Sequence, residues 1–157
     1  IQQGSSPNAK NIQLKVNYID GEGRQINPNE LNLGQNFTAR VTLINPGSFG
    51  SVIENCALTF QLPAGWEVSN NRLLDIVEAN RTYEYQDIRD DRVITFLDLY
   101  RGASKVIEIP LIAAYAGNFY QAPISIEAMY NNEIFARTGS GRVTVKSSKF
   151  DKARLTQ

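Results

Sequence analysis

Alternation of apolar and polar residues is the feature that most constrains how this chain can fold. In residues 12–18, 36–45 and 52–62 nearly every second side chain is apolar. Because successive side chains of a β-strand point to opposite faces, a period of two predicts strands that bury one face. The third segment would place Cys56, Leu58, Phe60 and Leu62 on the same buried face.

Further strand-like segments follow at residues 82–87, 92–99, 105–115, 122–130 and 142–146, with turn-forming residues between most of them. Gly117-Asn118 and Asn131-Asn132 are the expected turns in the last third of the chain. Short strands separated by turns are typical of an antiparallel, Ig-like β-sandwich. Residues 71–80 could form one helical face, so we predict an all-β fold with at most one short helix.

The chain of 157 residues has the length of a single domain and can bury a substantial core. Residues 1–10 are polar and rich in turn formers, which predicts a linker or lead-in, followed by one sandwich domain over 11–147. Residues 148–157 are expected to be a flexible tail. The cationic residues near this end, Lys146, Lys149, Lys152 and Arg154, suit a solvated terminus better than a binding tail.

The charge balance argues against a nucleic-acid partner. Lys and Arg together number 16, as do Asp and Glu, so the formal net charge is zero and no basic surplus exists to attract phosphates. No run of 18 apolar residues is present, so we expect no direct membrane insertion. The sequence starts at Ile1 without a signal-like segment, which suggests an excised or processed piece and leaves localisation unspecified.

Catalysis has little support in the residue inventory. The chain has no histidine, which removes Ser-His-Asp and Cys-His nucleophile systems and the commonest zinc ligand. The single cysteine, Cys56, lies on an apolar face and is expected to be a buried, slowly reacting thiol. No glycine-rich phosphate loop occurs. We therefore predict a protein that is not an enzyme and has no cofactor or metal.

Two clusters of polar side chains leave alternatives open. Residues 87–92 combine three aspartates with two arginines, which suits a charged turn better than a cation site, and we expect Arg89 or Arg92 to pair with Asp90, Asp91 or Asp98. Tyrosines on several strands could form a carbohydrate platform, although half-buried packing is the more common role. These tyrosines are Tyr83, Tyr85, Tyr115, Tyr120 and Tyr130. They keep a carbohydrate- or surface-binding Ig-like module as the alternative function.

Four motifs in a fixed order carry a resemblance to a known family. They are a glycine-turn segment at residues 20–34, Leu-Pro-Ala-Gly-Trp-Glu-Val at 62–68, Arg-Asp-Asp-Arg-Val at 89–93, and a pair at 116–123 and 127–130 that ends in Ala-Met-Tyr. Together they resemble the C-terminal domain of bacterial alpha-2-macroglobulins, which are large periplasmic protease traps. The resemblance extends over residues 12–145, although Asn132 stands where the family often has proline.

The resemblance implies a non-catalytic, receptor-binding-like macroglobulin domain that packs against a thioester-type domain of the same parent chain. Target proteases would engage the parent, and the location would be periplasmic or associated with the cell envelope. The thioester motif of the family, Cys-x-Glu-Gln, is absent here because Cys56 is followed by Ala57, Leu58 and Thr59. This chain is therefore not expected to bond covalently to a protease.

The resemblance also implies a site. In thioester-bearing members the residues around the Met-Tyr motif shield the thioester from water, which here points to Met129 and Tyr130 and, more weakly, to Ile134 and Phe135. A thioether side chain adapts well to an irregular surface, which suits a lid. The alternative is that Met129 is ordinary core at the end of a strand.

Overall fold

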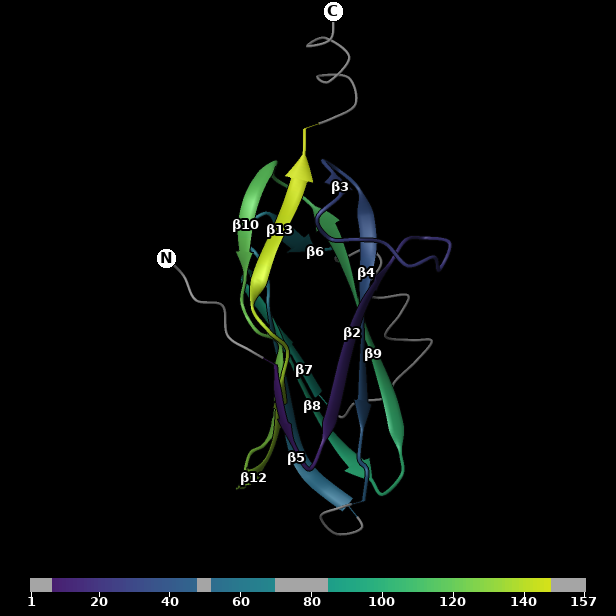
Figure 1. Cartoon of the computed structure of the whole chain (residues 1–157), viewed down its shortest axis with the longest axis vertical. Helices are drawn as coiled ribbons and strands as arrows, with labels where there is room; N and C mark the ends of the chain where they lie inside the picture. Colours follow the sequence, from purple (N-terminus) through teal and green to yellow (C-terminus); the bar gives the residue numbers. More distant parts are fainter. Residues whose placement is uncertain (1–6, 48–51, 70–84, 148–157) are drawn as a thin grey trace, which may run out of the picture.

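Strands form all the regular secondary structure in the described part of this computed structural model, residues 7–47, 52–69 and 85–147 (Figure 1). The prediction of an all-β, mainly antiparallel sandwich is therefore confirmed. The stretch at 71–80, where a helix was allowed, and the tail from residue 148 lie outside the described residues. No helix in the described ranges is long and apolar enough to cross a membrane.

One layer is a six-stranded antiparallel sheet. Its strands, in spatial order, are β1 (Asn8–Lys10), β12 (Asn131–Arg137), β11 (Ser125–Ala128), β5 (Val52–Gln61), β8 (Arg92–Tyr100) and β7 (Tyr85–Ile88). Asn8 to Lys10 fall within the segment predicted to be a lead-in. In the structure they form β1 and pair with Arg137 to Phe135 of β12. The sandwich thus begins slightly earlier than the sequence suggested.

The facing layer is a four-stranded antiparallel sheet of β2 (Gln13–Ile19), β4 (Asn36–Ile44), β9 (Ser104–Ala113) and β6 (Trp66–Val68). A smaller sheet at one end joins β10 (Gly117–Gln121), β13 (Gly141–Lys146) and β3 (Leu31–Asn32), and β13 runs parallel to β3. The predicted Gly117-Asn118 turn is wrong, since both residues lie in β10 and pair with β13.

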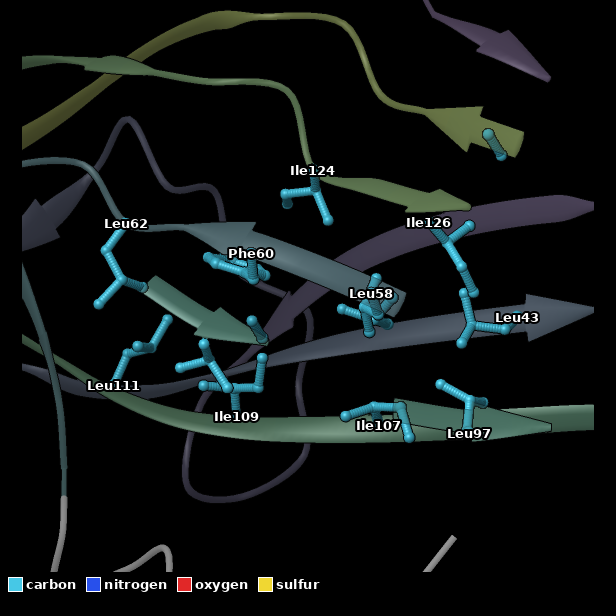
Figure 2. Packing of buried hydrophobic residues seen from close by; sticks show 14 of the residues in the cluster. Leu43, Leu58, Phe60, Leu62, Leu97, Ile107, Ile109, Leu111, Ile124 and Ile126 are labelled. Atoms are coloured by element: carbon cyan, nitrogen blue, oxygen red, sulfur yellow. The ribbon is translucent and has the colours of Figure 1, made fainter. Parts of the chain in front are cut away.

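The core lies between the two larger sheets. Cys56, Leu58 and Phe60 of β5 are fully buried, which confirms the face predicted from their alternation. They meet the inward faces of β4 and β9, where Val41 and Ile109 are equally buried. Figure 2 shows this interdigitation of side chains from the two layers. The connection between β11 and β12 lies at one end of the long axis of the sandwich, and β6 and β10 lie toward the other end (Figure 1).

Candidate functional site

The tight turn between β11 and β12 consists of Met129 and Tyr130, which we call the rim turn. Both side chains are exposed, Met129 by 50% and Tyr130 by 82%. The turn comes earlier than predicted, because Asn131 and Asn132 already belong to β12 and the register shifts between Glu127 and Ala128. Met129 is therefore not core, and the alternative interpretation of this residue is wrong.

A bulge in the neighbouring strand β5 holds the rim turn. The Met129 backbone N–H donates to the Asn55 carbonyl at 2.9 Å, one residue beyond the last paired residues of the two strands, Ala128 and Cys56. Asn55 has a positive φ of 55°, a conformation that Asn tolerates better than most residues. Its own N–H donates to Asp98 Oδ1 on β8 at 2.9 Å. Two neighbouring strands, β5 and β8, thus fix the position of the turn.

A groove of about 200 Å³ lies beside the rim turn. Its lining combines aliphatic, amide, phenol and carboxylate side chains: Val52, Ile53, Glu54, Asn55, Ala128, Tyr130, Asn131 and Ile134. Ile53 and Ile134 are only 2% and 3% exposed, so they belong to the core and form the base of the groove. The exposed side chains of the rim turn therefore stand beside a groove with an apolar base and polar side chains in its lining.

The four residues that the resemblance singled out fall into three environments. Met129 and Tyr130 lie together on the rim turn, whereas Ile134 is buried beneath it. Phe135, the next residue, points to the opposite face of β12, where it is half-buried on the outside of the six-stranded sheet. Its cross-strand neighbours there are Lys10 and Glu127. Met129 and Tyr130 on the rim turn are thus the most exposed residues of the set.

Cys56 follows the β5 bulge and is completely buried, as predicted. Burial raises the pKa of its thiol to about 11, and the negative charge of Asp98 adds to this shift while Lys105 opposes it. The sulfur is 3.6 Å from the Ile53 carbonyl, which accepts from the thiol. A buried thiol with a raised pKa is a poor nucleophile.

The charged turn between β7 and β8 is held by ion pairs between near neighbours. Arg92 pairs with Asp91 at 3.0 Å, as expected, and this hydrogen bond lowers the pKa of the Asp91 carboxyl. Arg89 pairs instead with Asp87 at 3.1 Å. Within the described residues no group of three or more potential metal ligands is assembled.

The described tyrosines do not gather into one platform. Tyr115 precedes β10 and Tyr120 lies within it, and both side chains are exposed, whereas Tyr130 belongs to the connection of β11 and β12, which lies at the opposite end of the sandwich (Figure 1). Tyr83 and the side chain of Tyr85 lie outside what the structure describes. The three tyrosines of this group whose side chains are described, Tyr115, Tyr120 and Tyr130, therefore do not share one binding face.

The end opposite the rim turn is closed by buried aromatic side chains, and we call it the aromatic end. The rings of Trp66 and Phe37 meet edge to face with centroids 4.9 Å apart, and Tyr18 packs on Trp66 at 5.5 Å. A turn bond from the Trp66 N–H to the Pro63 carbonyl aligns the Leu-Pro-Ala-Gly-Trp motif. Trp66 closes this end, as its position after the Pro-Ala-Gly break suggests.

Gly65 of the same motif lies directly under the Phe119 ring. A Cβ at Gly65 would be 2.2 Å from the nearest ring carbon of Phe119, so no larger residue fits without movement. The Gly65 carbonyl also accepts from the N–H groups of Ala114 and Tyr115. Two motifs that are far apart in the sequence therefore meet at the aromatic end.

These features define a macroglobulin-type β-sandwich domain whose exposed apolar side chains at the rim suit contact with another protein surface. Residues 12–133 match the family model described as the bacterial alpha-2-macroglobulin MG10 domain. The match covers more than half of the sequence, and the chain belongs to this family. No curated protein matches the chain.

Solved alpha-2-macroglobulins share the fold. The native form from E. coli superimposes with a TM-score of 0.79 and 15% identity, covering 92% of this chain and 10% of that one. Salmonella alpha-2-macroglobulin reacted with methylamine gives a TM-score of 0.78 and 19% identity, covering 90% and 10%. An E. coli structure from domain MG7 to the C-terminus gives 0.77 and 15%, covering 89% and 24%. The chain spans about a tenth of the longer proteins.

Proposed function

We propose that this chain is a non-catalytic domain of a bacterial alpha-2-macroglobulin-like protease inhibitor and that its rim turn packs against a thioester-type domain. The observation that carries the proposal is the exposure of Met129 and Tyr130 on a turn that two neighbouring strands hold in place. The family membership and the small share of the matched chains that it spans support a role as one domain among several.

The proposed mechanism is exclusion of water. A thioester is lost by hydrolysis when water reaches it, so an apolar cover delays its loss until the domains separate. The Met129 thioether adapts to an irregular surface, and Tyr130 supplies a broad ring with a polar tip. Cleavage of the parent by a target protease would move the domains apart and uncover the thioester. Ile134 acts from below by supporting the turn, and Phe135 offers a separate contact on the outer face.

The same hypothesis extends to the position of the domain in the parent chain and to the cellular location of the parent. We propose that the domain is at the C-terminal side of the parent, in the receptor-binding-like position, and that the parent acts in the periplasm or at the cell envelope. Target proteases meet the parent rather than this domain, because no covalent trapping group is present here. The matched structures include Salmonella alpha-2-macroglobulin reacted with methylamine and an E. coli protein activated by porcine elastase, which supplies practical probes for both steps.

The test uses the full-length parent and the small amine methylamine. Met129→Ala and Tyr130→Ala should each increase the rate at which methylamine releases a free thiol, by roughly tenfold if each loses about 1.4 kcal/mol of contact with the thioester domain. Tyr115→Ala is the matched control, because Tyr115 is also an exposed tyrosine but its N–H donates to the Gly65 carbonyl at the aromatic end. Thiol release is followed with a chromogenic reagent.

Two outcomes would count against the proposal. Equal release rates in the wild type, Met129→Ala and Tyr130→Ala would remove the shielding role. A parent in which methylamine releases no thiol would remove the thioester itself from the mechanism, leaving the family assignment intact.

A further inference from the structure

We propose that Asp98 and Asn55 are positioning residues that set the rim turn, and that the turn loses its geometry when the side-chain oxygen acceptor of Asp98 is removed. The inference rests on the proposed function for its biological role. The geometry that carries it lies in the register of three adjacent strands, β8, β5 and β11.

Strand β5 has a bulge where it pairs with β8. Ile53 pairs with Leu99 and Cys56 pairs with Leu97, so Glu54 and Asn55 together stand opposite the single residue Asp98. Two residues against one is the defining feature of a β-bulge, which leaves backbone groups of the longer strand without their regular partners. A side chain from the shorter strand can supply the missing acceptor, and Asp98 does so.

The Asp98 side chain accepts a hydrogen bond from the backbone of this bulge. Asp98 Oδ1 accepts from the Asn55 N–H at 2.9 Å. No Lys or Arg of the described residues lies within ion-pairing distance of this carboxylate, so its known contact is with the backbone of the bulge. A hydrogen bond to a charged acceptor is stronger than one between neutral groups. Asp98 therefore favours the left-handed conformation of Asn55 (φ 55°) over alternatives in which this N–H turns away.

The bulge is in turn hydrogen-bonded to the rim turn. The conformation of Asn55 directs its carbonyl toward β11, where it accepts from the Met129 N–H at 2.9 Å. The acceptor for the first residue of the turn is thus provided by a residue whose own N–H is held by Asp98. A change in the φ and ψ angles of Asn55 would move its carbonyl away from the Met129 N–H and allow Met129 and Tyr130 to sample other directions.

The experiment compares Asp98→Ala, Asp98→Asn and the control Asp87→Ala in this chain by amide hydrogen exchange measured residue by residue. Asp98→Ala should speed exchange of the Met129 amide roughly fivefold to tenfold, the effect of one lost hydrogen bond. Asp98→Asn keeps an oxygen acceptor and should restore exchange close to the wild-type rate. Asp87→Ala removes a carboxylate of the same sheet that pairs with Arg89, and it should leave Met129 exchange unchanged.

Selective faster exchange at Met129, rescued by Asp98→Asn, would support the proposal. Unchanged exchange at Met129 in Asp98→Ala would overturn it, as would a uniform increase across β5, β8 and β11, which indicates general destabilisation. Methylamine-triggered thiol release in the full-length parent separates the two hypotheses. If Met129→Ala leaves release unchanged while Asp98→Ala still speeds Met129 exchange selectively, the proposed shielding fails and the positioning role stands.

Discussion

Two aromatic residues at opposite ends of the sandwich, Trp66 and Tyr130, differ sharply in burial. At the aromatic end Trp66 is 2% exposed and is enclosed by Tyr18 and Phe37. At the rim Tyr130 is 82% exposed, and the contact that fixes its turn is a backbone hydrogen bond from Met129. Trp66 therefore contributes buried area to the stability of the fold, whereas the Tyr130 ring remains in solvent and contributes little to it.

The largest expected difference is between truncations at the two ends. Trp66→Ala should lower the free energy of unfolding by about 3–5 kcal/mol, because it removes a large buried side chain and leaves a cavity. Tyr130→Ala should change it by about 0.5 kcal/mol or less, since the ring is already in solvent. Denaturant unfolding of the two variants measures both values. Similar losses would show that the rim also stabilises the fold.

A smaller effect is expected from Gly65→Ala, which places a methyl group against the Phe119 ring. We expect a loss of about 3 kcal/mol in the free energy of unfolding, at the upper end for overpacking, because the added carbon would lie 2.2 Å from the ring. Gly21→Ala is the matched control, since no atom lies within 4 Å of the added carbon. It should change stability by about 1 kcal/mol or less. Adding Phe119→Ala to Gly65→Ala should cost less than the sum of the two single changes, and strict additivity would contradict the close contact.

The smallest expected effect is the pH dependence of the free energy of unfolding that arises from Cys56, whose thiol is buried in the core beside the rim turn. Its pKa is about 11 in the folded chain against an ordinary 9.0, so the folded state favours the neutral thiol. This contribution is complete below pH 9 and is lost as the pH rises toward 11, because the unfolded chain releases the proton first. The free energy of unfolding should fall by on the order of 2 kcal/mol across this window.

The Cys56→Ala variant isolates the thiol from other groups that titrate at high pH, such as lysines. Its stability should fall less than that of the wild type between pH 9 and 11, measured by denaturant unfolding at each pH. Parallel curves for the two proteins would mean that water reaches the thiol and that the core is open near the bulge.

Alternation predicted the long strands because their buried faces follow directly from the period of two. The segments at 36–45 and 52–62 match β4 and β5 to within one residue, and Cys56, Leu58 and Phe60 share the expected face. The short strand β10 was missed because Gly117 favours turns in isolation. Its place in β10 depends on pairing with β13 and on the Phe119 ring, which packs near Gly117 as well as over Gly65.

The candidate site was predicted in part. The family resemblance pointed to Met129 and Tyr130, which share the rim turn, but it grouped them with Ile134, which is buried. Asn55 and Asp98 were missed as a pair that supports the turn. Their contact depends on a bulge that puts two residues of β5 opposite one residue of β8, and a one-residue irregularity of this kind leaves no clear trace in the sequence pattern.

The strand pairings that close the sandwich also determine when it can form. β1 pairs with β12 through Asn8 and Arg137, and β3 pairs with β13 through Leu31 and Val145, so each of these pairings joins opposite ends of the described chain. Contacts this distant in sequence form slowly, since a long loop must close before they contribute. A chain emerging from the ribosome would therefore leave β1 without its partner strand until Arg137 had been synthesised, and β3 without its partner until Lys146 had been synthesised. An unpaired strand edge is a site for strand-to-strand aggregation during that interval.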